Sequence, residues 1–140
     1  MATILLIDDD EDLRGLTADL LELHGHEVRT CSNGVEGLHA LDEEFPQLVI
    51  TDVEMPALDG PAMVQRMFVD NVGRENIPVV IVSGAEGVSK IAAAVGTPYY
   101  LAKPFPGRQL LQLVDRALVE AVPPRPPSPA ATSTSSSSTT

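Results

Sequence analysis

Short runs of apolar residues, each ended by polar or turn-forming residues, recur along residues 1–122 of the chain. The runs around Ile4, Leu48 and Val79 are continuously apolar and too short for helices, which indicates strands buried on both faces. The runs around Val28 and Tyr100 alternate or are shorter, which suits the two edges of a sheet. The expected strands are residues 3–7, 27–31, 48–52, 77–82 and 99–102.

Each run is followed by apolar residues at three- and four-residue spacing, the pattern of one face of a helix. Gly25 offers a stop for the first helix, and Ser32 or Asn33 offers a cap for the second. Pro61 suits the first turn of the third helix, and the fifth should begin near Gly107. The expected inward positions, helix by helix, are Leu13, Leu16, Leu20 and Leu23; Val35, Leu38 and Leu41; Met63, Val64, Met67 and Phe68; Val88, Ile91, Ala92 and Val95; and Leu110, Leu111, Val114 and Leu118.

Regular alternation of strands and helices predicts an α/β fold with a parallel sheet, right-handed crossovers and helices on both faces. The strand order 2-1-3-4-5 satisfies both demands, since it places the first, third and fourth strands in the interior and the other two at the edges. This is the flavodoxin-like, doubly wound (βα)5 arrangement. We expect one domain over residues 1–122. Residues 123–140 are rich in proline, then in serine and threonine, which indicates a disordered tail or linker.

The amino-acid composition limits the kinds of binding partner and the cellular compartment that we expect. A formal net charge of -11 disfavours direct contact with nucleic acid and favours a cation. Cys31 is the one cysteine in the sequence, so no intramolecular disulfide can form, which fits a reducing compartment. We also find no signal peptide, membrane span or DNA-binding motif in the sequence. The expected location is the cytoplasm.

Polar side chains follow four of the predicted strands at the same edge of the sheet. They are Asp8 and Asp9, Asp52, Ser83, and Lys103. Carboxylates at close quarters repel one another unless a cation lies between them, and Mg²⁺ prefers oxygen ligands of this kind. The hydroxyl of Ser83 and the ammonium of Lys103 could hold an anionic group, so the edge suits a phosphoryl group. Asp52, at the centre, is the expected nucleophile.

Each of these residues has an ordinary structural explanation when taken alone. Asp9 or Asp10 could cap a helix, Ser83 could belong to a turn, and Lys103 could be a surface charge. Their joint placement at strand ends is what favours the site.

These motifs resemble those of the receiver domains of two-component response regulators, of the chemotaxis-regulator type, over about residues 2–121. The matching segments are Ile7-Asp8-Asp9-Asp10, Thr51-Asp52-Val53-Glu54-Met55-Pro56 with Asp59-Gly60, Val82-Ser83-Gly84-Ala85, and Lys103-Pro104-Phe105. The resemblance implies a signalling switch that promotes only its own Mg²⁺-dependent phosphorylation and dephosphorylation. It also implies a histidine kinase or phosphotransfer protein as phosphodonor and a downstream protein as target.

By the same resemblance, Asp52 accepts the phosphoryl group, and Asp9 and Asp52 ligate Mg²⁺ together with the main-chain carbonyl of Glu54. Asp8 acts through a metal-bound water. The resemblance further implies a face for any homodimer, made by the fourth helix and the fifth strand.

Ser83 and Lys103 are implied to hold phosphoryl oxygens, and Ser83 and Tyr100 to act as the switch, with Tyr100 changing rotamer. A cis bond is implied at Lys103–Pro104. The chain departs from the common pattern at Ser83, where threonine is frequent, and in a slightly shorter segment between Ser83 and Lys103.

Two other functions stay open. A haloacid-dehalogenase-like phosphatase also uses an aspartate nucleophile after a strand, although Asp52-Val53-Glu54 matches its paired aspartates only loosely and the chain is short for a cap domain. The third reading is a receiver-like interaction module that does not take phosphate, which the complete acidic set disfavours.

Overall fold

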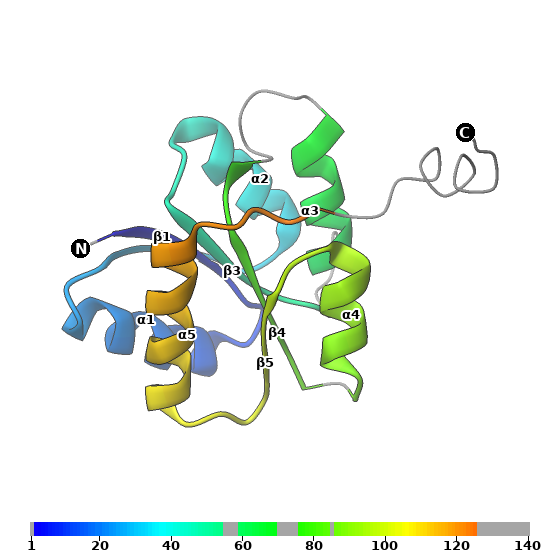
Figure 1. Cartoon of the computed structure of the whole chain (residues 1–140). Coiled ribbons are helices and arrows are strands. Elements are labelled where there is room, and N and C mark those ends of the chain that lie inside the picture. Colours follow the sequence, from blue (N-terminus) through cyan, green and yellow to red (C-terminus); the bar gives the residue numbers. More distant parts are fainter. Residues whose placement is uncertain (1, 55–58, 70–75, 85, 126–140) are drawn as a thin grey trace, which may run out of the picture.

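A computed structural model describes residues 2–54, 59–69, 76–84 and 86–125 (Figure 1). Strands and helices alternate throughout this part of the chain, as predicted. The strands are β1 Thr3–Ile7, β2 Glu27–Cys31, β3 Leu48–Asp52, β4 Val79–Ser83 and β5 Tyr99–Ala102. The helices are α1 Glu11–Leu23, α2 Gly34–Glu43, α3 Gly60–Val69, α4 Val88–Val95 and α5 Gly107–Glu120.

The strands form one parallel sheet in the order β2-β1-β3-β4-β5. This confirms the predicted flavodoxin-like topology, with β2 and β5 at the edges. Every residue of β3 and β4 is buried, as their continuous apolar runs require. Exposed residues in β2 and β5 mark them as edge strands.

The sheet separates two hydrophobic cores. On one face, β-strand side chains pack with buried residues of α2, α3 and α4, including Leu41, Met63 and Val95. On the other face, they pack with α1 and α5, through residues such as Leu21 and Leu110. Helices on both faces complete the three-layer arrangement that Figure 1 shows.

Gly37 of α2 packs closely against buried side chains of β1 and α3. A Cβ atom added to Gly37 would come within 2.5 Å of Cδ1 of Ile7 and 3.0 Å of Sδ of Met63. Only a residue without a side chain fits between these core groups in their present positions. Gly37 therefore sets the distance between this helix and the strand that ends at the acidic loop.

The leucine stripe predicted for α1 is wrong in part. Leu16 and Leu23 are 69% and 83% exposed, whereas Thr17, Ala18 and Leu21 are buried. Leucines occur on more than one side of this helix, so periodicity alone does not select a face. Burial selects the side with Thr17 and Ala18, because small side chains let the helix lie close to the sheet.

A second correction concerns α2, where Val35 was expected to face inward but is 42% exposed. It lies in the first turn, next to the Asn33 side chain that caps the helix by accepting a hydrogen bond from the Glu36 N–H at 2.9 Å. Leu41 is buried and Leu38 packs partly against the core, as predicted. The capping role belongs to Asn33 rather than Ser32.

Several predictions fall on residues outside the described ranges or stay untested. Met55, Pro56 and residues 126–140 lie outside them, as do the side chains of Met67 and Phe68. The predicted boundary at residue 122 therefore stays a prediction, although α5 ends at Glu120. Among the described residues, no helix is both long and apolar enough to cross a membrane.

Candidate functional site

The sheet register brings the carboxyl ends of four strands together. Ile7 of β1 pairs with Thr51, Asp52 pairs with Val82, and Ser83 pairs with Ala102. The residues that end these strands, or follow them directly, must therefore lie side by side at one edge of the sheet. The sequence places three aspartates, a serine and a lysine there.

The loop after β1 is held by short local hydrogen bonds. Oδ1 of Asp10 accepts from the Leu13 N–H at 3.1 Å and caps α1. Oδ1 of Asp8 accepts from the Asp10 N–H at 2.9 Å, and Nη1 of Arg14 donates to the Asp8 carbonyl at 2.8 Å. These contacts fix Asp8 and leave the adjacent Asp9 exposed at the rim.

Asp52 ends β3 and is 9% exposed. Its Oδ1 accepts a hydrogen bond from the Val53 N–H at 2.8 Å, which orients the carboxylate. Its Oδ2 lies 3.2 Å from Nζ of Lys103. The carboxylate is thus held on both oxygens at the end of a fully buried strand.

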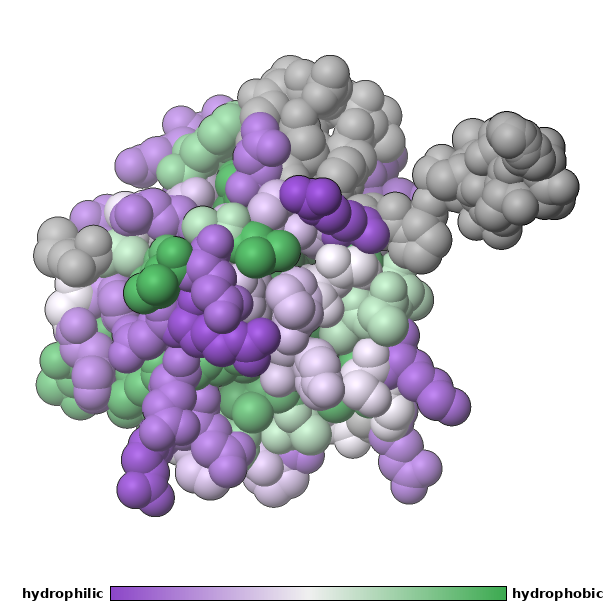
Figure 2. All heavy atoms as spheres, viewed as in Figure 1, coloured by the Kyte–Doolittle hydropathy of each residue, from purple (hydrophilic) through white to green (hydrophobic). Residues whose placement is uncertain are grey.

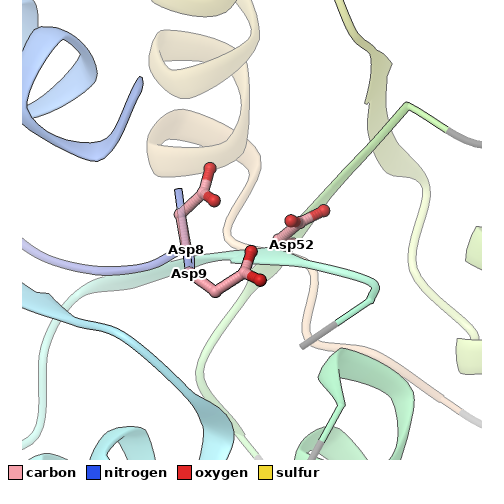
Figure 3. A group of neighbouring side chains, drawn as sticks. All are labelled: Asp8, Asp9 and Asp52. Carbon is pink, nitrogen blue, oxygen red and sulfur yellow. The ribbon is translucent and has the colours of Figure 1, made fainter. Parts of the chain in front are cut away.

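Asp8, Asp9 and Asp52 form a carboxylate cluster at this edge. One carboxylate oxygen from each lies within 4.8 Å of the others, and Figure 3 shows the side chains reaching from the ends of β1 and β3 toward the same region. Asp8 and Asp52 are buried and Asp9 is exposed. The donors are all hard oxygen atoms, which suits a divalent cation such as Mg²⁺.

Lys103 closes the cluster from the opposite side. Its Nζ lies 3.1 Å from Oδ2 of Asp8 and 3.2 Å from Oδ2 of Asp52. The peptide bond between Lys103 and Pro104 is cis, as the family resemblance implied. One ammonium against three carboxylates leaves excess negative charge in a partly buried place, and this excess is the electrostatic reason that a divalent cation fits.

The pKa values follow from this arrangement. Burial raises the pKa of Asp52; the Lys103 ammonium opposes that shift and the Asp8 carboxylate adds to it. Burial alone would lower the pKa of Lys103, but its hydrogen bond to Asp8 and the charges of Asp52 and Asp8 outweigh burial and raise it. Lys103 therefore stays charged at neutral pH and can neutralise an anion.

Ser83 is buried at the end of β4, and its carbonyl accepts a hydrogen bond from the Lys103 N–H at 2.8 Å. This bond places Ser83 beside Lys103, as predicted. Glu54 is exposed two residues after Asp52. Tyr100 lies on the edge strand β5 and is 43% exposed, while its neighbour Tyr99 is fully buried.

Sequence reasoning missed Arg14. Its guanidinium braces the loop of Asp8 through the main-chain carbonyl, which no side-chain pattern reveals. A signal was nevertheless present, because Arg14 follows the capping Asp10 and the acidic residues Glu11 and Asp12 at the start of α1, where a cation can reach back to the loop before the helix.

A model of the response regulator receiver domain family matches residues 4–115. The chain belongs to this family. It is 35% identical over 126 residues to a transcriptional regulatory protein of Haemophilus influenzae, a CpxR homologue, and the match covers 89% of this chain and 53% of that protein. It is 32% identical over 117 residues to the C4-dicarboxylate transport transcriptional regulatory protein DctD of Rhizobium meliloti, with coverage of 82% and 25%.

Solved structures agree with this assignment. A CheY-like response regulator receiver domain protein from Methanospirillum hungatei superposes with a TM-score of 0.77 at 27% identity, covering 86% of this chain and 96% of that one. The receiver domain of NtrX from Brucella abortus gives 0.71 at 32% identity, covering 83% and 98%. The chain thus matches isolated receiver domains almost end to end, but spans only a quarter to about half of the two transcriptional regulators. It contains the receiver domain of a two-component response regulator, which is a signalling domain.

Proposed function

We propose that this receiver domain is a phosphoacceptor switch and that Asp52 accepts the phosphoryl group. The observation that carries the proposal is the cluster itself: carboxylates of Asp8, Asp9 and Asp52 within 4.8 Å of one another, faced by the ammonium of Lys103. Phosphoryl transfer needs a positioned nucleophile and neutralised charge, and little other covalent chemistry.

In the proposed reaction, a carboxylate oxygen of Asp52 attacks the phosphorus of a phosphohistidine or an acyl phosphate. A P–O bond forms to Asp52, and the bond from phosphorus to the donor atom breaks, with the electron pair leaving on the donor. Lys103 holds a phosphoryl oxygen through its ammonium, and the Ser83 hydroxyl holds another. The product is an aspartyl phosphate.

Asp9, Asp52 and the main-chain carbonyl of Glu54 would hold Mg²⁺, with Asp8 acting through a bound water. The ion would neutralise the charge that develops on the phosphoryl oxygens. What this chain itself supplies is the fixed loop: Asp10 caps α1 and Arg14 braces Asp8, so the carboxylates need little reorganisation when the cation binds.

The partners we propose are a histidine kinase or phosphotransfer protein as donor and a protein that recognises the phosphorylated form. Transcriptional regulators among the relatives fit such an output. The net charge of -11 argues against direct binding of DNA by this domain. The α4 and β5 face is the expected site of any homodimer, and the cytoplasm is the expected location.

Two rival functions make different predictions. A phosphatase of the haloacid-dehalogenase type would hydrolyse small phosphate esters with many turnovers, which we do not expect from this chain. An interaction module that takes no phosphate would fail to bind beryllofluoride in the presence of Mg²⁺. The complete carboxylate cluster and its lysine favour the phosphoacceptor over both.

The test is incubation with acetyl phosphate and Mg²⁺, followed by intact mass. We expect the chain to gain the mass of one phosphoryl group, and the gain to disappear when EDTA removes the cation. Absence of any mass gain, with beryllofluoride also failing to bind, would contradict the proposal. Sustained release of inorganic phosphate from small esters would favour the phosphatase.

A further inference from the structure

Helix α1 buries a threonine while it leaves two of its leucines exposed. Thr17 is 7% exposed, whereas Leu16 and Leu23 of the same helix are 69% and 83% exposed. Figure 2 shows hydrophobic residues at the surface over α1, at the lower left. Hydrophobicity alone therefore does not explain why a threonine lies on the buried side, and its hydroxyl group needs a hydrogen-bond partner.

The hydroxyl of Thr17 differs from those of two other buried threonines. Oγ1 of Thr51 donates to the Asp52 carbonyl at 3.0 Å. Oγ1 of Thr97 donates to the Val79 carbonyl at 2.6 Å. Within the part of the chain that the structure describes, no group forms a hydrogen bond with the Thr17 hydroxyl. A buried hydroxyl without a partner costs folding free energy, so such groups are usually paired with protein or with ordered water.

A small internal cavity lies beside Thr17 and reaches the carboxylate cluster. Its wall contains Thr17, Asp8 and Asp52, and is otherwise made of apolar residues such as Ile50 and Leu110. The centre of a water molecule can occupy about 10 Å³ of this cavity, which is enough space for one water. A fully apolar cavity stays dry, but three polar residues in the wall offer a water the partners that it needs.

The two carboxylates have acceptor positions left for such a water. Oδ1 of Asp8 accepts from the Asp10 N–H at 2.9 Å, and Oδ2 accepts from Nζ of Lys103 at 3.1 Å. The carboxylate of Asp52 accepts from the Val53 N–H and from the same ammonium. An ionised carboxylate can accept about four hydrogen bonds, so each of the two has about two positions left.

We propose that Thr17 is a positioning residue that holds one buried water between the carboxylates of Asp8 and Asp52. The water accepts a hydrogen bond from the Thr17 hydroxyl and donates one to each carboxylate, so the partners of all three bonds are protein groups. These bonds orient the two carboxylates before a cation or a phosphodonor binds. The effect on Mg²⁺ binding and phosphorylation rests on the proposed function, whereas the presence of the water does not.

Three full-length variants separate the hydroxyl of Thr17 from the shape of its side chain. Thr17→Val removes the hydroxyl and keeps the branched shape, while Thr17→Ser keeps the hydroxyl and removes a methyl group. Thr30→Val makes the first exchange at an exposed position of β2 and is the matched control. Neither threonine belongs to the carboxylate cluster.

Stability in EDTA tests whether the hydroxyl holds a water. If it does, Thr17→Val loses bridged hydrogen bonds to the carboxylates, and the equilibrium constant for unfolding should rise about two- to tenfold. If the hydroxyl is simply unpaired, its removal relieves a buried polar group, and the same constant should fall. Thr30→Val should stay within about a factor of two of wild type. High-resolution crystal structures should show the water in wild type and not in Thr17→Val.

Mg²⁺ affinity and labelling rate test the positioning role. Carboxylates that are no longer held must reorganise when the cation binds. Thr17→Val should therefore weaken Mg²⁺ binding and slow labelling by acetyl phosphate, each about two- to tenfold. Thr17→Ser should restore both toward the wild-type values, because it supplies the hydroxyl again. Loss of packing alone would not produce this restoration, since serine fills the site less well than valine.

The possible failures of the water and of the proposed function can be told apart. The inference is wrong, and the proposed function stands, if wild type binds Mg²⁺ and takes the label but Thr17→Val unfolds less readily than wild type. The same holds if the wild-type cavity contains no water, or if Thr17→Ser is impaired as much as Thr17→Val. If wild type neither binds Mg²⁺ nor takes the label, the proposed function is wrong and the positioning role of Thr17 falls with it.

Discussion

Nζ of Lys103 lies 3.2 Å from Oδ2 of Asp52, although 51 positions separate the two residues in the sequence. The parallel order β3-β4-β5 produces this contact, because it carries the ends of separate strands to one edge of the sheet. The same ammonium contacts Asp8 from β1, so a single cation links both sides of the carboxylate cluster.

Removal of the Lys103 ammonium group should destabilise the domain. Lys103→Ala leaves the buried carboxylates of Asp8 and Asp52 facing each other without a counter-charge, at a cost of roughly 1–3 kcal/mol in the free energy of unfolding at neutral pH in EDTA. Millimolar Mg²⁺ should recover part of this loss. Lys90→Ala, at an exposed lysine of α4, is the control, and thermal unfolding is the measurement. Equal stability of the two variants in EDTA would contradict the assigned role of the ion pair.

Asp52→Asn should have the opposite effect on stability when no divalent cation is present. Burial and the Asp8 charge raise the pKa of Asp52 in the folded state above its ordinary value of 3.8. A raised pKa contributes stability below the unfolded pKa, and that contribution is lost as the pH rises through the folded pKa. At neutral pH the ionised carboxylate therefore weakens the fold, and its replacement removes the penalty.

We expect Asp52→Asn in EDTA to melt on the order of a few degrees above wild type at pH 7, and the difference to shrink as the pH falls toward 3.8. Thermal melts across this pH range provide the measurement. A variant that melts below wild type at pH 7 would show that the Lys103 ion pair outweighs burial.

Mg²⁺ should stabilise wild type and Asp10→Asn against unfolding, but should stabilise Asp9→Asn much less. A ligand at 100 times its dissociation constant adds about 2.7 kcal/mol to the free energy of unfolding. Asp9→Asn should lose most of this gain, because Asp9 belongs to the carboxylate cluster. Asp10→Asn removes an equal charge one residue away and keeps the helix cap, so it should retain the gain. Equal loss in both variants would point to nonspecific charge screening.

Two helical glycines should respond differently to alanine. Gly15→Ala in α1 meets nothing within 4 Å and should stabilise the domain by about 1 kcal/mol, the difference in helix propensity. Gly37→Ala in α2 gains the same propensity but forces Ile7 and Met63 to move, which costs about 1–3 kcal/mol. Denaturant unfolding of both variants measures the difference. Equal stabilisation by the two substitutions would mean that the side chains around Gly37 can move aside without cost.

The strand order and the acidic edge could be predicted because they depend on features that sequence carries directly. Continuous apolar runs identify interior strands, and the residues that end those runs must meet at one edge. The sequence predicted less accurately which sides of α1 and α2 are exposed. In α1, Leu16 and Leu21 are equally apolar, and only packing decides that Leu21 is buried.

Contacts made by main-chain groups also could not be predicted from the sequence. The N–H groups of Val122 and Arg125 donate to the Tyr99 hydroxyl and to the Gly96 carbonyl, and neither donor has a side-chain signature in the sequence. Residues 123–125 belonged to the predicted tail or linker because of their prolines. Pro124 is buried in the structure, and the boundary at residue 122 stays a prediction.

The central claim is that Asp52, and no other carboxylate, receives the phosphoryl group. The direct measurement is borohydride reduction of the chain after acetyl phosphate treatment, which converts a phosphorylated aspartate to homoserine, followed by peptide mapping. Asp19→Asn, at an exposed carboxylate of α1, serves as the matched control for Asp52→Asn. We predict homoserine at position 52 in wild type and Asp19→Asn, and none in Asp52→Asn. Homoserine at Asp8, Asp9 or Asp59 in wild type, or undiminished labelling of Asp52→Asn, would contradict the account.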